Sequence, residues 1–131
     1  MLESILLSLI CTQIESGDDG SYIEKITFYQ NSFTSEKRVE LESFYHESLK
    51  KSWVIDNNQS TNYEISESGL LSFSVPYENT YEDKEALVFE QIKAKIQYIV
   101  DPENKKFKTI YTEEGSTEST EVRGNCLNLS D

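Results

Sequence analysis

The sequence predicts a mostly β fold: an antiparallel up-and-down meander of about seven to nine strands that forms a small barrel or sandwich. Three observations predict it. Apolar residues recur at every second position through most of the chain, short polar stretches separate these segments, and 131 residues with 37% hydrophobic content can bury one modest core. We therefore expect a single β-rich domain spanning residues 1–131.

Residues 2–15 fit two patterns. Ile5 and Leu9 belong both to a helical stripe and to a strand face. The turn-forming residues at 16–20 lead directly into the next strand, which favours a strand over the second half of the segment. The sequence therefore allows either a short N-terminal helix or an N-terminal strand.

Period-two alternation is clearest in the next two segments. Ile26 and Phe28 share one face of a strand at 22–29. After a break at Asn31 and Ser32, a second strand follows at 38–45. These two segments predict adjacent antiparallel strands.

Apolar and polar stretches alternate in the middle of the chain. Residues 52–56 and 63–65 continue the strand pattern, and we expect the polar stretch 57–62 between them to form a turn. Residues 71–75 carry the pattern on. The least patterned stretch, 76–85, predicts a long loop with room for one helical turn.

The last third of the chain predicts a hairpin and a closing strand. Residues 82–93 fit both a helix and a strand. The turn sequence at 101–104 (Asp-Pro-Glu-Asn) favours a hairpin with the strand at 107–111. A polar turn at 113–119 then leads to a closing strand at 120–129.

Strong acidity limits the partners that this chain can attract. It has 24 Asp and Glu against 12 Lys and Arg, a formal charge of -12. Such a field repels phosphate backbones at long range, so we expect no nucleic-acid partner. The apolar run from Ile5 to Cys11 is too short to span a bilayer, so we expect no membrane span. A net charge of this size generally keeps a protein soluble. The functional alternative is that the charge steers a basic protein partner toward the chain.

Two cysteines near opposite ends of the chain are compatible with either a cytoplasmic or an exported protein. Cys11 and Cys126 fit neither a CxxC motif nor a metal-binding spacing. The start of the chain lacks the positive charge and cleavage site of a signal peptide, which predicts a cytoplasmic protein with two buried thiols. The alternative is an exported domain with a Cys11–Cys126 disulfide, which would stabilise the fold by about 4 kcal/mol and place the first and last strands side by side.

Residues suited to catalysis or metal binding are few. His46, the only histidine, lies between Tyr45 and Glu47 with no nucleophile motif beside it. One stretch has oxygen-bearing side chains at the spacing of a calcium loop, but Thr61 stands where that loop requires glycine, so we favour a polar turn and expect no metal or cofactor. The residues of this weak candidate loop are Asp56, Asn58, Ser60, Asn62, Glu64 and Glu67.

Aromatic residues provide the remaining candidate site. An up-and-down barrel can enclose a small apolar ligand, although aromatic residues at strand spacing more often belong to the core. The predicted topology resembles that of calyx-type barrels such as lipocalins, while the Gly-x-Trp opening of that family is absent. The candidate lining residues are Trp53, Phe73, Phe89, Tyr98 and Phe107.

Three functions follow, in this order of preference. The first is a non-catalytic acidic binding or interaction domain with a protein partner, which requires no absent motif. The second is a small calyx-like barrel that carries a small apolar ligand. The third is a hydrolase-type enzyme that uses His46 and a carboxylate.

Overall fold

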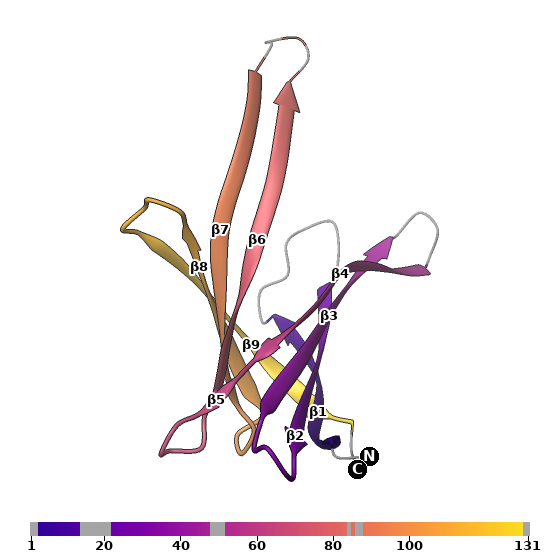
Figure 1. Cartoon of the computed structure of the whole chain (residues 1–131). Coiled ribbons are helices and arrows are strands. Elements are labelled where there is room, and N and C mark those ends of the chain that lie inside the picture. The colour runs from indigo at the N-terminus through magenta and orange to yellow at the C-terminus, as the bar shows by residue number, and fades with distance from the viewer. Residues whose placement is uncertain (1–2, 14–21, 48–51, 84, 86–87, 130–131) are drawn as a thin grey trace.

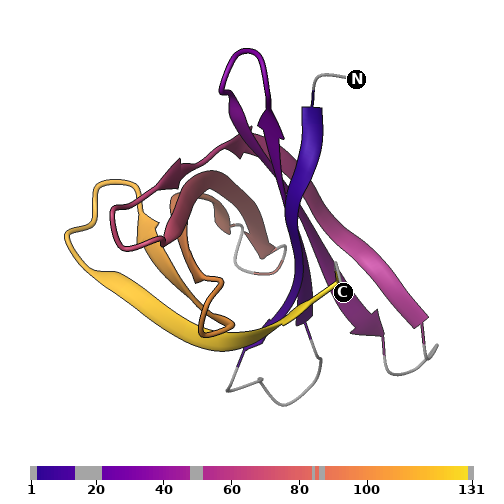
Figure 2. The ribbon, with the colours of Figure 1, turned by 90° about the horizontal axis from the view of Figure 1, so that it is seen from below.

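The computed structural model describes residues 3–13, 22–47, 52–83, 85 and 88–129. These residues form a nine-stranded antiparallel meander that rolls into a nearly closed barrel (Figure 1). Seen along its axis, the sheet curls into a ring (Figure 2). This confirms the predicted fold class and, of the two predicted architectures, gives the barrel. No helix occurs in the described part of the chain.

Nine strands follow one another in an up-and-down order. They are β1 Glu3–Gln13, β2 Tyr22–Asn31, β3 Lys37–Glu47, β4 Ser52–Asn62, β5 Glu64–Ile65, β6 Leu71–Asp83, β7 Val88–Asp101, β8 Lys106–Glu113 and β9 Ser119–Asn128. Their order in the sheet is β4-β3-β2-β1-β9-β8-β7-β6-β5. Sequence neighbours therefore pair with each other except β4 and β5, which lie at opposite edges of the sheet, and the pairing of β1 with β9 joins the two ends of the chain.

The chain that follows β4 brings the two edges of this sheet together. The short strand β5 pairs with the first residues of β6. Just before it, the Tyr63 N–H donates to the carbonyl of Lys37 on β3, at 3.1 Å. Higher in the barrel, the Gln59 side chain of β4 donates to the Pro76 carbonyl of β6, at 3.2 Å. The seam between β4 and β6 is thus bridged by β5 and by a side chain.

Strands β2 and β3 lie where alternation predicted them. Ile26 pairs with Leu41 and Phe28 with Val39, and all four side chains are buried. The predicted β7–β8 hairpin is also confirmed. Its turn is held by Asn104, whose backbone N–H donates to the Asp101 carboxylate at 3.2 Å and whose side chain donates to the other oxygen at 2.8 Å.

The polar stretch 57–62 is a strand, so the turn expected there is wrong. It forms the second half of β4, in which Gln59 pairs with Leu41 and Thr61 with Val39. The neighbouring strand supplies hydrogen-bonding partners for the backbone, and this outweighs the low strand propensity of asparagine and serine.

The loop expected over 76–85 is wrong over residues 76–83, because β6 continues to Asp83 and pairs with β7 throughout. A proline within this strand is tolerated for a geometric reason. The Pro76 carbonyl faces β4, so its missing N–H lies on the side that does not pair with β7.

Both segments that fitted either a helix or a strand are strands. β1 occupies the whole of Glu3–Gln13, with an irregularity in its pairing between Ile5 and Leu7. β7 is continuous over Val88–Asp101. The short N-terminal helix allowed by the sequence is absent from the described part of its segment, and the turn expected at 16–20 lies outside the described residues.

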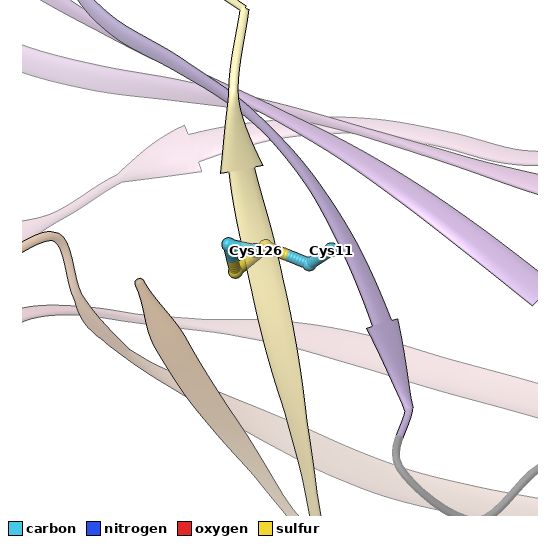
Figure 3. The surroundings of a disulfide bond; sticks show 2 residues. All are labelled: Cys11 and Cys126. Carbon is cyan, nitrogen blue, oxygen red and sulfur yellow. A yellow bond between two sulfur atoms is a disulfide. The ribbon is translucent and has the colours of Figure 1, made fainter. Parts of the chain in front are cut away.

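The first and last strands are linked covalently (Figure 3). Cys11 and Cys126 lie directly opposite each other on β1 and β9, both are buried, and their sulfur atoms form a disulfide of 2.05 Å. Of the two alternatives drawn from the sequence, the structure therefore has the bridge. It encloses a separation of 115 residues, for which the chain-entropy estimate gives about 4 to 5 kcal/mol.

Gly124 allows β9 to pack closely beside this bridge. A Cβ atom at Gly124 would lie 2.1 Å from the Thr12 carbonyl oxygen and 2.2 Å from the ring of Phe107. No larger residue fits without moving backbone or core atoms. The Phe107 ring thus covers the space that a side chain would occupy.

Candidate functional site

A carboxyl group lies inside the barrel. Ile26 and Phe28 point into the core from β2, and because side chains alternate along a strand, Glu24 points the same way. Its neighbours on the adjacent strands are Cys11 of the disulfide and the buried Ser43. The Glu24 carboxyl is therefore surrounded largely by core.

Tyr98 reaches this carboxyl from the opposite wall. It lies on β7, four strands from β2 by way of β1, β9 and β8, and its hydroxyl donates a hydrogen bond to Glu24. The Oε2 atom of Glu24 is buried and has no hydrogen-bond partner among the described residues. Burying a carboxylate with an unsatisfied oxygen is costly, so this pair is an exception within an otherwise apolar core.

Burial changes the proton affinity of both groups. It raises the pKa of Glu24 from 4.5 to about 7, and the hydrogen bond from Tyr98 offsets part of that rise. It also raises the pKa of Tyr98 far above its usual value, with a further contribution from the nearby Glu24 charge. The tyrosine consequently stays protonated, while the carboxyl exchanges its proton near neutral pH.

Three of the five aromatic residues proposed from the sequence are buried core residues. Phe73 stacks on Tyr98, with ring centroids 4.8 Å apart and planes inclined by 2°. Phe28 meets Phe73 edge-on at 6.0 Å, and Phe107 is 4% exposed. The side chains of the other two, Trp53 and Phe89, lie outside the described part of the structure.

Sequence reasoning did not single out Glu24. The signal was available, because Glu24 shares a strand face with Ile26 and Phe28, and a carboxylate on an apolar face is unusual. Its partner Tyr98 was proposed, but as a ligand contact. Their proximity depends on the curvature of the barrel, which alternation does not reveal.

The weak calcium-loop candidate is not a loop. Asp56, Asn58, Ser60 and Asn62 lie along β4, Glu64 lies in β5 and Glu67 in the turn that follows. A strand rises about 3.3 Å per residue, so the β4 positions are spread over roughly 20 Å and cannot surround one ion. Among the described residues, no three side chains of the metal-binding types gather.

His46 lies on β3, opposite Trp53 on β4. Its side chain lies outside the described part of the structure, so the distance from its imidazole to a carboxylate stays untested. The hydrolase alternative is accordingly still a hypothesis.

Two hollows lie on the outer wall of the barrel. The larger, here called the upper groove, has a volume of about 570 Å³ and lies over β6, β7 and the turn after β8. Its charged lining residues are Glu78, Lys93, Lys95, Glu113 and Glu114. Charges of both signs therefore alternate along it.

The smaller hollow, here called the basic hollow, has a volume of about 370 Å³ and lies over β7, β8 and β9. The side chains that line it from the outer face are Leu70, Ile99, Asp101, Lys106, Lys108 and Arg123. Three are cationic and one is anionic. The sequence analysis proposed none of them, because neither β-strand alternation nor any motif distinguishes them from ordinary surface residues.

The strand register fixes how these side chains are placed. Ile99, Lys108 and Arg123 lie directly opposite one another across three adjacent strands. In the next register position, Asp101 faces Lys106. All therefore belong to one continuous patch of outer wall.

The acidic neighbours of this patch are largely engaged elsewhere. Both oxygens of Asp101 accept hydrogen bonds from Asn104, and these bonds, more than the charge of Lys106, lower the pKa of Asp101. Arg123 donates to Glu121 at 2.8 Å. Among the described residues, Lys106 and Lys108 form no ion pair.

Comparison of the chain with protein-family models, curated proteins and solved structures gave no match. In the part of the chain described above, no helix is long and apolar enough to cross a membrane. The described structure thus offers two kinds of candidate site: a carboxyl inside the barrel and two hollows on its outer wall.

Proposed function

We propose that this chain is a non-catalytic binding domain that contacts its partner through the outer wall of the barrel. The observation that carries the proposal is the contrast between wall and interior. Both hollows lie outside, whereas Phe73 and Tyr98, two of the residues expected to line a ligand cavity, stack against each other inside.

The size of the two hollows and the strands that form their walls support this role. The two hollows have volumes of about 570 and 370 Å³, within the usual range of binding sites in proteins. Their walls are mostly paired strands, which hold side chains more firmly than loops do. The outer wall can therefore present a defined arrangement of groups to a partner.

The disulfide favours an exported setting for this domain over the cytoplasmic one. Such bridges persist in oxidising compartments and are rare where thiols are kept reduced. Cys11 and Cys126 are the only cysteines and are joined to each other. Protein purified from its host without reductant should accordingly have a mass two hydrogens below that of the dithiol form.

One observation favours a second candidate function, the ligand-carrying barrel. The Glu24 Oε2 atom has no partner among the described residues, and a ligand with a hydrogen-bond donor could satisfy it. This candidate requires the core to open around Tyr98. It predicts a small molecule that stays bound during purification.

Native mass spectrometry combined with crosslinking separates the candidates. The chain is isolated from its own host without reductant, after treatment of the extract with an amine-reactive crosslinker. The binding-domain proposal expects a ligand-free chain crosslinked to a protein through Lys93, Lys95, Lys106 or Lys108. A chain that retains a small molecule, or crosslinks only through lysines outside both hollows, would contradict it.

A further inference from the structure

The basic hollow reverses the charge of the molecule over a small area. The whole chain has a formal charge of -12, yet the charged groups that line this hollow are Lys106, Lys108 and Arg123 against Asp101 alone. Cations concentrated on an acidic protein attract an anion locally while the net charge repels large polyanions. The hollow therefore suits a single anionic group.

Two of these cations are held directly opposite each other. Lys108 on β8 and Arg123 on β9 are partners in the antiparallel pair and project from the same face. Like charges in this position disfavour the sheet unless a counter-charge lies between them. Glu121 forms an ion pair with Arg123, and Asp101 accepts hydrogen bonds from Asn104. The charges of Lys106 and Lys108 also act on Asp101 and Glu121, respectively, but neither lysine forms an ion pair with them, so both ammonium groups can donate to a ligand.

Apolar side chains line the hollow beside the lysines. Ile99 is the strand partner of Lys108, and Leu70 lies on the same wall. Lys108 is itself half-buried, so part of its side chain packs against the wall of the hollow. An ion pair that is partly shielded from water is stronger than a fully exposed one.

We infer that the basic hollow binds a carboxylate attached to an apolar group, with Lys106 and Lys108 as the cationic contacts and Ile99 and Leu70 as the apolar wall. The inference rests on the proposed function, since it identifies the chemistry that this part of the outer wall recognises. Because that function has a protein partner, the carboxylate belongs to an acidic side chain of a polypeptide next to an apolar one, and a small organic acid is the alternative that the test distinguishes.

The test is a titration of the isotope-labelled chain followed by two-dimensional NMR of its backbone amides. Hexanoate is the main probe, acetate lacks its apolar part, and hexylammonium reverses its charge. We expect hexanoate to shift the amides of Ile99, Lys108 and Arg123 and to bind at least five-fold more tightly than either of the other probes. The affinity should fall as salt is added.

Two double variants show whether the lysines of the hollow are responsible. K106Q/K108Q should weaken hexanoate binding about ten-fold, because exposed ion pairs are each worth about two- to five-fold in affinity. K93Q/K95Q removes the same charge from the upper groove and should leave the affinity within about two-fold. The dispersion of the amide spectrum shows whether each variant is folded.

Several results would overturn the inference. Acetate binding as tightly as hexanoate would exclude the apolar wall, and equal weakening by both double variants would indicate a general charge effect. Binding of the protein partner identified by crosslinking distinguishes failure of the anion site from failure of the proposed function. If that partner binds K106Q/K108Q normally, the anion site is wrong while the binding domain stands.

The source of the carboxylate is distinguished by one further probe. A blocked dipeptide of leucine and glutamate, titrated under the same conditions, should bind more tightly than hexanoate if the natural ligand is a polypeptide. If it is a small acid, hexanoate should bind more tightly. Absence of shifts with both probes at millimolar concentrations would contradict the site itself.

Discussion

Strands β6 and β7 each pass through two different environments. In the lower half of the pair, Phe73 and Val75 of β6 and Tyr98 and Val100 of β7 are at most 4% exposed. In the upper half, the described side chains of β6 beyond Val75, such as Glu78, are exposed, and the hairpin rises above the rest of the barrel (Figure 1). Both halves are nevertheless continuous strand.

The comparison shows that pairing alone is enough to keep the upper half extended. The β6–β7 register runs unbroken from Leu71 opposite Val100 to Asp83 opposite Val88. On its other side, β7 pairs with β8 only from Ala94 onward. The upper half thus has its backbone hydrogen bonds, while its described side chains are exposed or half-buried, and we expect it to contribute less to stability than the lower half.

Removing the disulfide should have the largest effect, since it constrains the packed region as a whole. The variant C11A/C126A is expected to lose about 4 kcal/mol of unfolding free energy, measured by urea denaturation without reductant. Reduction of the wild-type chain with dithiothreitol should give a similar loss. A change below about 1 kcal/mol would mean that sheet closure does not depend on the bridge.

Phe73 tests the lower half directly. Its ring is 4% exposed and contacts Phe28 and Tyr98, so Phe73→Ala should cost about 3 to 4 kcal/mol through lost packing and the cavity left behind. Phe33→Ala is the control, because Phe33 lies in the β2–β3 turn and is 78% exposed. Similar losses for the two variants would show that the core is loosely packed.

Glu24 should make the packed region sensitive to pH. Its pKa is about 7 in the folded chain and 4.5 when unperturbed, so between these values the folded state holds a proton that the unfolded state has lost. The stabilisation is complete below pH 4.5 and is lost as the pH rises through 7. The contribution over this window is about 3 kcal/mol, since one pKa unit corresponds to about 1.4 kcal/mol.

The measurement compares the wild type with Glu24→Gln at several pH values. Carboxylates whose pKa is lowered, such as Asp101 and Glu121, change stability in the opposite direction, and the difference between the two proteins cancels them. Relative to the wild type, Glu24→Gln should gain stability steadily from pH 5 to pH 8. A difference that does not vary with pH would show that Glu24 titrates normally.

The same two halves explain how far the sequence could predict the fold. Alternation gave β2 and β3 correctly because their inward residues, such as Phe28 and Val39, are buried. It missed the upper half of β6 and the second half of β4, where polar residues are held in strands by pairing with a neighbour. Periodicity reports burial, and a strand without a buried face has no such signal.

The candidate sites were harder to predict for a related reason. The pairing of Glu24 with Tyr98 and the gathering of Lys106, Lys108 and Arg123 depend on strand register and barrel curvature. A sequence pattern gives the face on which a side chain lies but not which distant strand it meets. The two cysteines were evident as a possible pair, but the sequence left their disulfide as the alternative to two buried reduced thiols.

Tyr77 gives the smallest expected effect and the most direct comparison of the two halves. It lies on β6 four residues after Phe73 and on the same face, but it is 36% exposed. Its main aromatic contact is an edge-on one with Tyr111, at 5.8 Å. Tyr77→Ala should therefore cost only about 1 kcal/mol in urea denaturation, the range of one aromatic pair and partial burial.

Phe73→Ala serves as the reference for this last measurement, since both variants remove an inward aromatic ring from the same strand. If Tyr77→Ala costs as much as Phe73→Ala, the upper half is packed like the lower one, and pairing alone does not keep it extended. If the cost is small, hydrogen exchange should still show protected amides where β6 and β7 pair above Pro76. Protection combined with a small loss would mean that the hairpin rests on backbone pairing, which leaves its side chains free to meet a partner.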